Sequence, residues 1–167
     1  MTEIDAFSPA WRIAEAVATG SVTAEIVIRS ALDRVAAVNP TVNAFTDVTA
    51  ERALAQARKL DSERDAGKPL GTLAGVPFAV KNLFDIQGLP TRAGSRINRD
   101  LAPATHDAAL IQRLSAAGAV LIGGLNMGEY AYDFTGENAH DGACRNPHDT
   151  LRMAGGSSSG SGSATAA

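Results

Sequence analysis

Residues 106–123, HDAALIQRLSAAGAVLIG, decide the fold class of this chain. Apolar residues recur at helical spacing from Ala109 to Leu114, and Gly118 is typical of a helix end. The run Ala119–Gly123 that follows predicts a short, buried strand. A helix that leads directly into a buried strand is half of a βαβ unit. We therefore expect an α/β fold, with helices around a mixed, mostly parallel sheet.

Similar patterns predict the elements around this unit. Capping residues, helical spacing and proline positions give three earlier helices, and alternating apolar residues give one strand. The predicted bounds are 9–20, 23–39 and 49–66 for the helices and 42–48 for the strand. Residues 73–86 favour β structure and residues 88–99 are irregular. Residues 126–152 form a long polar segment, and such segments are more often functional than loops of ordinary length.

The composition is that of a globular protein, because 45% of the residues are hydrophobic and 20% are charged. The net charge of -3 gives no reason to expect direct nucleic-acid or membrane-surface binding. No apolar run reaches the roughly 18 residues of a membrane span. Residues 1–5 are acidic and lack a secretory-signal pattern. With Cys144 as the single cysteine, we expect a cytoplasmic protein.

Lys81 is the first candidate for chemistry. It is one of three lysines and lies in the apolar segment Val76–Phe84. Burial disfavours a charged amine, so the pKa of Lys81 should fall toward neutrality, as suits a general base or nucleophile. Two other interpretations stay open: the ammonium group reaches solvent at the strand end, or it pairs with Asp85.

The second candidate is Gly155–Ser163, which holds five of the eleven serines and four of the sixteen glycines. Glycines permit a backbone that directs several N–H groups at one anion, and serine hydroxyls donate or relay protons. Ala164–Ala167 is typical of the start of a helix. A flexible linker is the alternative, while a phosphate-binding P-loop is disfavoured because no Gly-Lys-Ser/Thr follows.

The other polar residues give weaker signals. The three histidines show no metal-ligand spacing, so we expect no metal and no other cofactor; they are His106, His140 and His148. Cys144 matches no cysteine-hydrolase signature. Four carboxylates of the polar segment either pair in a cleft or are solvated, and they are Glu129, Asp133, Glu137 and Asp141.

Two separated motifs then point to one family. GVPFAVKN (75–82) and GGSSSGS (155–161) resemble the amidase signature family. Three comparable stretches lie between them in order: GLNMGEY, TGEN and RNP. Within the family, residues 80–149 are most similar to amidases of the 1-carboxybiuret hydrolase type, and less to glutamyl-tRNA amidotransferase A subunits. The resemblance implies the N-terminal part of one domain, with a helical lead-in over 1–70 and the start of the catalytic core over 71–167.

The resemblance also implies a chemistry. Family members use a Lys–Ser–Ser relay without histidine, in which the lysine falls on Lys81 and the bridging serine, held by a cis peptide, falls on Ser157. Their nucleophilic serine belongs to a second Gly/Ser motif, which these 167 residues do not contain. We therefore expect the chain alone to be inactive and its sheet to be incomplete at the C-terminus. Supporting contacts are expected from Gly155, Gly156 and Ser158, and substrate contacts from Asn126, Met127, Glu137 and Asn138.

The expected activity is hydrolysis of a small carboxamide or ureido C–N bond through an acyl-enzyme. A homo-oligomer or a small companion subunit is the expected assembly. The alternatives are a transamidase that acts on mischarged tRNA with glutamine, and a non-catalytic relic or binding module. Two positions depart from the family pattern: Ser159 stands where glycine is usual, and Gly128 where an acidic residue is common.

Overall fold

The computed structural model describes Ile4 and Phe7–Ala167, so the acidic residues 1–5 lie outside the described part except for Ile4. The residues group into two compact units, each made of three stretches of chain. Unit 1 is built from the chain up to Val35 with Thr49–Phe78 and Ala109–Ile122. Unit 2 is built from Ala36–Val48, Ala79–Ala108 and Gly123–Ala167.

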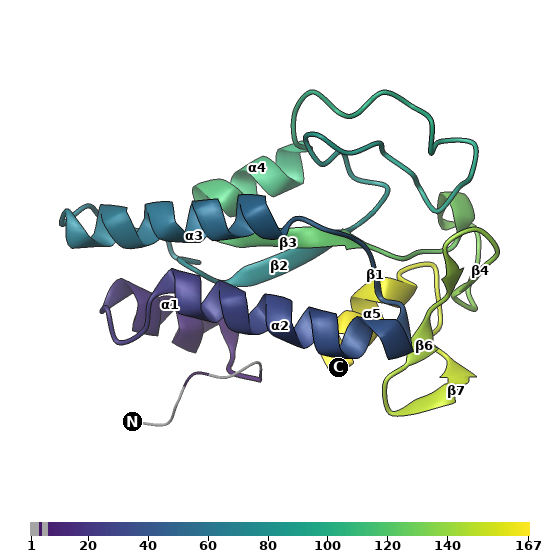
Figure 1. Ribbon diagram of the computed structural model, residues 1–167, viewed down its shortest axis with the longest axis horizontal. Helices are drawn as coiled ribbons and strands as arrows, with labels where there is room; N and C mark the ends of the chain where they lie inside the picture. The colour runs from purple at the N-terminus through teal and green to yellow at the C-terminus, as the bar shows by residue number, and fades with distance from the viewer. Residues whose placement is uncertain (1–3, 5–6) are drawn as a thin grey trace. The chain divides into compact units, whose positions relative to one another are not determined.

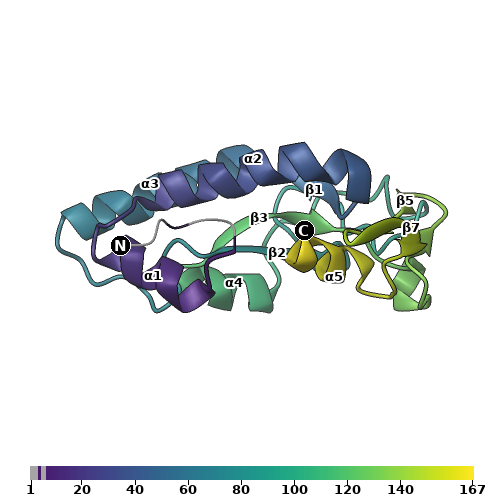
Figure 2. The same ribbon diagram turned by 90° about the horizontal axis from the view of Figure 1, so that it is seen from below.

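Unit 1 is a layered arrangement of helices on strands. Its elements are α1 (Ala10–Ala18), most of α2 (Ala24–Val42), α3 (Ala50–Asp65), α4 (Ala109–Ala116) and the first residues of β2 (Pro77–Lys81) and β3 (Val120–Leu125). In this unit α2 and α3 cover one face of the strands, and α1 and α4 cover the other (Figure 2). Helices α1 and α3 bury apolar residues at helical spacing, such as Ala53, Ala57 and Leu60 of α3.

Polar contacts fix how these helices pack. The Asp61 carboxylate of α3 accepts hydrogen bonds from the amides of Ala24 (2.8 Å) and Glu25 (3.0 Å), which begin α2. These amides have no partner within their own helix, so Asp61 acts as an N-cap from a different helix. Gln56 donates to the carbonyl of Ala119 (2.9 Å) and attaches α3 to the strand layer.

The end of α2 corrects one prediction. The helix does not stop before Pro40 but continues to Val42. Pro40 lies in the last turn, where it removes one helical hydrogen bond without ending the helix. The Asn39 side chain then bonds both backbone groups of Phe45, at 2.7 and 3.0 Å. These bonds begin β1 at Phe45, so β1 (Phe45–Val48) is shorter than the predicted strand.

The central sheet has the order β1-β3-β2, and Figure 1 shows β2 and β3 side by side. Strand β1 pairs with β3 antiparallel. Strands β2 and β3 run in the same direction, because hydrogen bonds link Val120 to Val76 at their starts and Asn82 to Leu125 at their ends. All six residues of β3 are buried, as predicted. The α/β class and the mixed sheet are confirmed, although parallel pairing in the described residues is limited to β2 and β3.

The polar segment of unit 2 is more ordered than predicted. It contains the 3₁₀ turn η1 (Glu129–Ala131) and two antiparallel two-stranded ribbons. The ribbons are β4 (Glu137–Asn138) with β5 (Gly142–Ala143), and β6 (Arg145–Asn146) with β7 (Asp149–Met153). The last helix is α5 (Ser159–Ala166). Within the described residues, no helix combines the length and the apolar character needed to cross a membrane.

Candidate active site

Lys81 and Ser157 meet in unit 2, although 76 residues separate them in the sequence. Lys81 is the last residue of β2, and its Nζ donates a hydrogen bond to Ser157 Oγ at 3.0 Å. Both residues are half-buried. Within the described chain no ion pair joins Lys81 to Asp85, whose carboxylate instead accepts a hydrogen bond from Thr91. The structure thus gives Lys81 a serine as its partner.

Burial lowers the pKa of Lys81 below its usual value. The direction agrees with the expectation from the apolar sequence around it. A lysine with a lowered pKa spends more time as a neutral amine, which has a lone pair that can accept a proton. At 3.0 Å, the Ser157 hydroxyl lies within proton-transfer reach of such an amine.

The backbone around Ser157 requires glycine for two different reasons. Gly155 has φ +80°, a conformation that other residues rarely adopt. Gly156 has no room for a side chain, because a Cβ there would lie 2.7 Å from the carbonyl oxygen of Asp133. The Gly156–Ser157 peptide bond is cis, which is the geometry that the family resemblance implies at this position.

The Gly/Ser stretch is not a linker, because α5 begins at Ser159, five residues before the predicted helix start. Gly160 allows this close packing: a Cβ there would lie 2.4 Å from the carbonyl oxygen of Ala44. Ser163 also donates to the carbonyl of Arg145 at 2.9 Å. Packing therefore stabilises a helix whose Ser- and Gly-rich sequence has little helical propensity of its own. Ser158 is exposed at the N-cap, and its side chain makes no capping hydrogen bond.

Three of the four residues predicted to contact substrate are buried. Asn126 and Met127 are fully buried, and Asn138 is 6% exposed. The Asn126 amide donates to the carbonyls of Asn43 and Gly142, both at 3.0 Å. Their substrate contacts remain a prediction, while the structure gives the side chains of Asn126 and Asn138 a structural role. Glu137, the fourth residue, is exposed and pairs with Arg145 at 3.3 Å.

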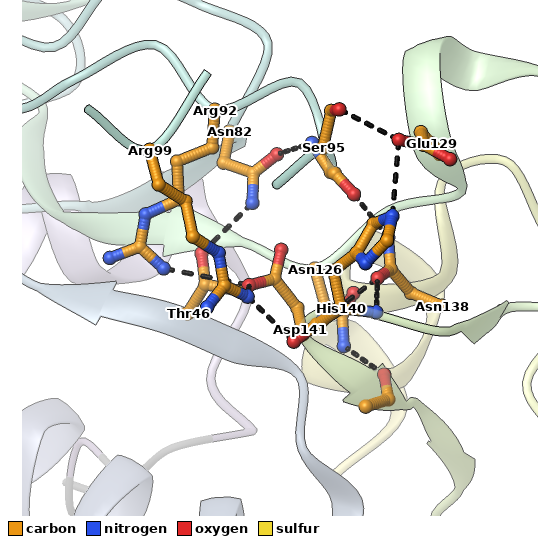
Figure 3. A network of polar contacts seen from close by, with 12 residues as sticks. Thr46, Asn82, Arg92, Ser95, Arg99, Asn126, Glu129, Asn138, His140 and Asp141 are labelled. Carbon is orange, nitrogen blue, oxygen red and sulfur yellow. Dashed lines mark hydrogen bonds and ion pairs between the residues drawn. The ribbon is translucent and has the colours of Figure 1, made fainter. Parts of the chain in front are cut away.

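Asn138 belongs to a polar network that connects two loops (Figure 3). Its amide nitrogen donates to the carbonyls of Gly94 and Met127, both at 2.8 Å. Its oxygen accepts from the amides of His140 and Asp141, at 2.7 and 2.8 Å. This buried side chain thus donates two hydrogen bonds and accepts two, and all four partners are backbone groups.

The remaining candidates have partners of other kinds. Each of the four carboxylates contacts hydrogen-bond donors or cations. Glu129 contacts Ser95 and His140, and Asp133 accepts from amides of its own turn. Glu137 pairs with Arg145, and Asp141 pairs with Arg92 and Arg99. Burial raises the pKa of the Cys144 thiol. The described residues contain no group of three or more His, Cys, Asp or Glu that could hold a metal ion.

Asn82, the residue after Lys81, is not among the residues predicted from the sequence. Its side chain donates to Thr46 Oγ1 at 3.1 Å and accepts from the amide of Gly94 at 2.9 Å. Its backbone carbonyl also accepts from the amide of Ala93. Asn82 is 4% exposed, so these bonds fix the chain directly beside Lys81. A polar residue at the end of a buried strand is the signal that could have revealed it.

The fold and the Lys–Ser pair define an α/β protein of the amidase class. The sequence profile described as Amidase matches residues 26–167, and the chain belongs to this family. The predicted family is therefore confirmed. The described fold corresponds to the N-terminal part of the amidase signature fold.

Particular relatives are similar over nearly the whole chain. Identity to AtzE, the 1-carboxybiuret hydrolase subunit of Pseudomonas sp. (strain ADP), is 58% over 155 residues, which cover 93% of this chain and 34% of that protein. Identity to the A subunit of the glutamyl-tRNA(Gln) amidotransferase of Salinispora tropica is 46%, covering 100% of this chain and 34% of the relative.

Solved structures of related proteins also resemble this chain. A chain of a vestigial protein complex, which bears on the evolutionary origins of an s-triazine catabolic enzyme, superposes with a TM-score of 0.93 at 56% identity, covering 94% of this chain and 34% of its own. A bacterial aryl acylamidase of the amidase signature family gives a TM-score of 0.87 at 30% identity, covering 92% and 32%. The chain thus spans about one third of the length of the relatives it matches.

Proposed function

We propose that this chain supplies the general base and the bridging serine of an amidohydrolase. Its substrate would be a small carboxamide or ureido compound. The observation that supports this proposal most directly is the 3.0 Å hydrogen bond between Lys81 Nζ and Ser157 Oγ. The lowered pKa of Lys81 supports the same role, because a lysine must be unprotonated to accept a proton.

In the proposed reaction, neutral Lys81 accepts the proton of the Ser157 hydroxyl. Ser157 in turn accepts a proton from a nucleophilic serine, which the family resemblance assigns to a Gly/Ser motif outside these 167 residues. The nucleophile forms a bond to the amide carbonyl carbon, and the C–N bond then breaks. The relay returns the proton to the departing nitrogen. Water hydrolyses the acyl-enzyme, which releases the acid and regenerates the serine.

The test is ammonia release from a panel of small carboxamides and ureido compounds by the complete protein that contains this chain. We expect Lys81→Met and Ser157→Ala each to lower kcat by about 10²–10⁴-fold, as for the loss of an acid–base group. A matched control is Lys59→Met, which removes a lysine whose side chain is 73% exposed. The proposal fails if Ser157→Ala retains wild-type turnover. We also expect the 167-residue chain alone to release no ammonia.

A transamidase is the second candidate, and the 46% identity to the Salinispora tropica relative supports it. Glutamine-dependent turnover that requires companion subunits would favour this candidate. Hydrolysis of small amides without glutamine would favour the amidohydrolase. Reading the gene beyond the codon for Ala167 addresses the remaining alternative of a non-catalytic relic, because a continuing frame with a second Gly-Gly-Ser motif supports an enzyme.

We further propose a cytoplasmic protein that assembles with a companion subunit. The relative AtzE is a hydrolase subunit, and one similar solved chain belongs to a protein complex. Purification of the complete protein under native conditions should recover a second, smaller chain in a constant ratio. A single chain in a monodisperse peak would contradict the companion subunit.

A further inference from the structure

A tight turn beside Ser157 is closed by one carboxylate. Asp133 Oδ1 accepts from the amide of Thr135 (2.9 Å) and from its hydroxyl (2.6 Å), and Oδ2 accepts from the amide of Gly136 (2.8 Å). These hydrogen bonds, led by that of the Thr135 hydroxyl, lower the pKa of Asp133. The carboxylate is therefore ionised at neutral pH and holds three donors of the turn Asp133–Gly136.

The turn Asp133–Gly136 contacts the backbone on the N-terminal side of Ser157. The amide of Gly155 donates to the carbonyl of Thr135 at 3.2 Å. A Cβ at Gly156 would lie 2.7 Å from the Asp133 carbonyl oxygen and 3.1 Å from the Gly136 nitrogen. Gly155 and Gly156, the two glycines before Ser157, thus pack directly against this turn.

Gly128 connects the same turn to Ser157 itself. Its amide donates to the carbonyl oxygen of Ser157 at 3.1 Å. A Cβ at Gly128 would lie 2.6 Å from the Cβ of Asp133, so the aspartate side chain occupies the space that glycine leaves. This packing gives a physical reason for glycine at a position where the resemblance leads one to expect an acidic residue.

We propose that Asp133 is a positioning residue for Ser157: it closes the turn Asp133–Gly136, and this turn, with Gly128, holds the Ser157 backbone so that Oγ meets Lys81 Nζ. The inference rests on the proposed function, in which Ser157 carries the proton. Asp133 acts through Gly128, Gly155 and Gly156, since its carboxylate is occupied by donors of its own turn. Loss of the carboxylate should therefore displace Ser157 from Lys81.

The first test follows the titration of Lys81 by NMR in the complete protein with ¹³C-labelled lysine. The Lys81 signal is identified by its absence in Lys81→Met. We expect Asp133→Ala and Ser157→Ala to change the Lys81 side-chain signal in the same way, because each variant removes the Ser157 hydroxyl from Lys81 Nζ. Asp149→Ala is the matched control, because Asp149 likewise closes a local turn by accepting from the amide of Leu151. An Asp133→Ala chain that is folded and keeps the wild-type Lys81 titration would overturn the proposal.

The second test begins with a variant that keeps the Asp133 carboxylate. Gly128→Ala places a methyl group against Asp133, and Asp133→Gly removes most of that contact. In the complete protein we expect Gly128→Ala to lower kcat by about 10²-fold with little change in KM, as for a displacement of about 1 Å at a catalytic group. In the Asp133→Gly background, Gly128→Ala should lower kcat much less, because the Asp133 side chain no longer occupies the space of the added methyl group.

Additive effects of the two substitutions would overturn the inference. Failure of the proposed function has a different signature, because turnover would then survive in Lys81→Met or Ser157→Ala. The NMR titration does not depend on turnover, so it tests the placement of Ser157 whichever reaction the complete protein carries out.

Discussion

The two compact units of this chain are stabilised by different kinds of buried residue. Unit 1 has an apolar interior, built from residues such as Ile13, Val17, Ile28, Ile111 and Leu121. Unit 2 also buries three asparagines whose side chains bond backbone groups, and they are Asn82, Asn126 and Asn138. The difference follows from local structure, because helices satisfy their own backbone groups, whereas irregular segments need side chains as partners.

The largest expected effect tests the asparagines of unit 2. Asn138→Ala should lower the free energy of unfolding by about 4 kcal/mol, because two buried and two partly buried backbone groups lose this partner. Urea unfolding followed by circular dichroism measures the loss. Asn146→Ala is the control, since Asn146 accepts only from the amide of His148. Equal losses in the two variants would show that unit 2 does not depend on the buried network.

A smaller loss is expected for the apolar interior of unit 1. Ile111 is fully buried in α4, and Ile111→Ala should cost about 3 kcal/mol through lost burial and the cavity left behind. Leu110→Ala is the control, because the neighbouring Leu110 is 44% exposed, and its free energy of unfolding should change by no more than about 0.5 kcal/mol. The same urea titration measures both. A loss at Leu110 as large as that at Ile111 would contradict the packing described for α4.

Unit 1 also has polar contacts between helices, and removal of the Asp61 cap should have a moderate effect. Asp61→Ala removes the cap from the amides of Ala24 and Glu25 and should cost about 1 kcal/mol. Asp65→Ala is the control, because the Asp65 side chain is 69% exposed and pairs only with the adjacent Arg64. Thermal unfolding of the two variants under identical conditions compares them. If Asp65→Ala is the more destabilising, Asp61 does not cap α2.

The smallest expected effect concerns the pH dependence of stability. The pKa of Lys81 is lowered by folding, so the unfolded chain binds more protons between the folded and unfolded pKa values. Below the folded pKa, the buried charge of Lys81 therefore lowers the free energy of unfolding by its full amount. This destabilisation disappears as the pH rises toward the unfolded pKa. Lys81→Met removes the penalty, so its advantage over the wild type should shrink as pH rises toward about 10.

Urea unfolding at a series of pH values from 7 to about 10 measures this change. Lys59→Met is the control for loss of a lysine from the surface, since the Lys59 side chain is 73% exposed. The prediction is wrong if the difference between Lys81→Met and the wild type has the same pH dependence as the difference for Lys59→Met.

Much of the fold could be predicted because it depends on local patterns. The helices α1, α3 and α4 lie close to their predicted positions, and β3 is fully buried, as its apolar run indicates. The predicted end of α2 and the predicted start of α5 are wrong. At α5 a tertiary contact outweighs local preference, because Gly160 packs against Ala44. At α2 the reason is local, because Pro40 lies in the last turn, where the loss of one hydrogen bond does not end the helix.

The candidate site shows the same division. Lys81 is recognisable as a lysine in an apolar segment, and Ser157 through the family motif. The polar pattern of residues 126–152 predicts a loop and does not reveal the structural roles of Asn138 and Asp133. Asparagine and aspartate are common in solvated loops, so composition alone does not show which of them bind buried backbone.

The sequence by itself determined the class of the fold, the family and the pair of residues most suited to proton transfer. Periodicity, burial of apolar residues and short motifs are encoded locally, and they can be read from neighbouring residues. Only the tertiary structure decided that Lys81 Nζ lies 3.0 Å from Ser157 Oγ and that Gly128 makes room for Asp133. Lys81 and Ser157 are 76 residues apart, and the space that Gly128 leaves for Asp133 depends on how the backbone of the polar segment folds, so no local pattern specifies either geometry.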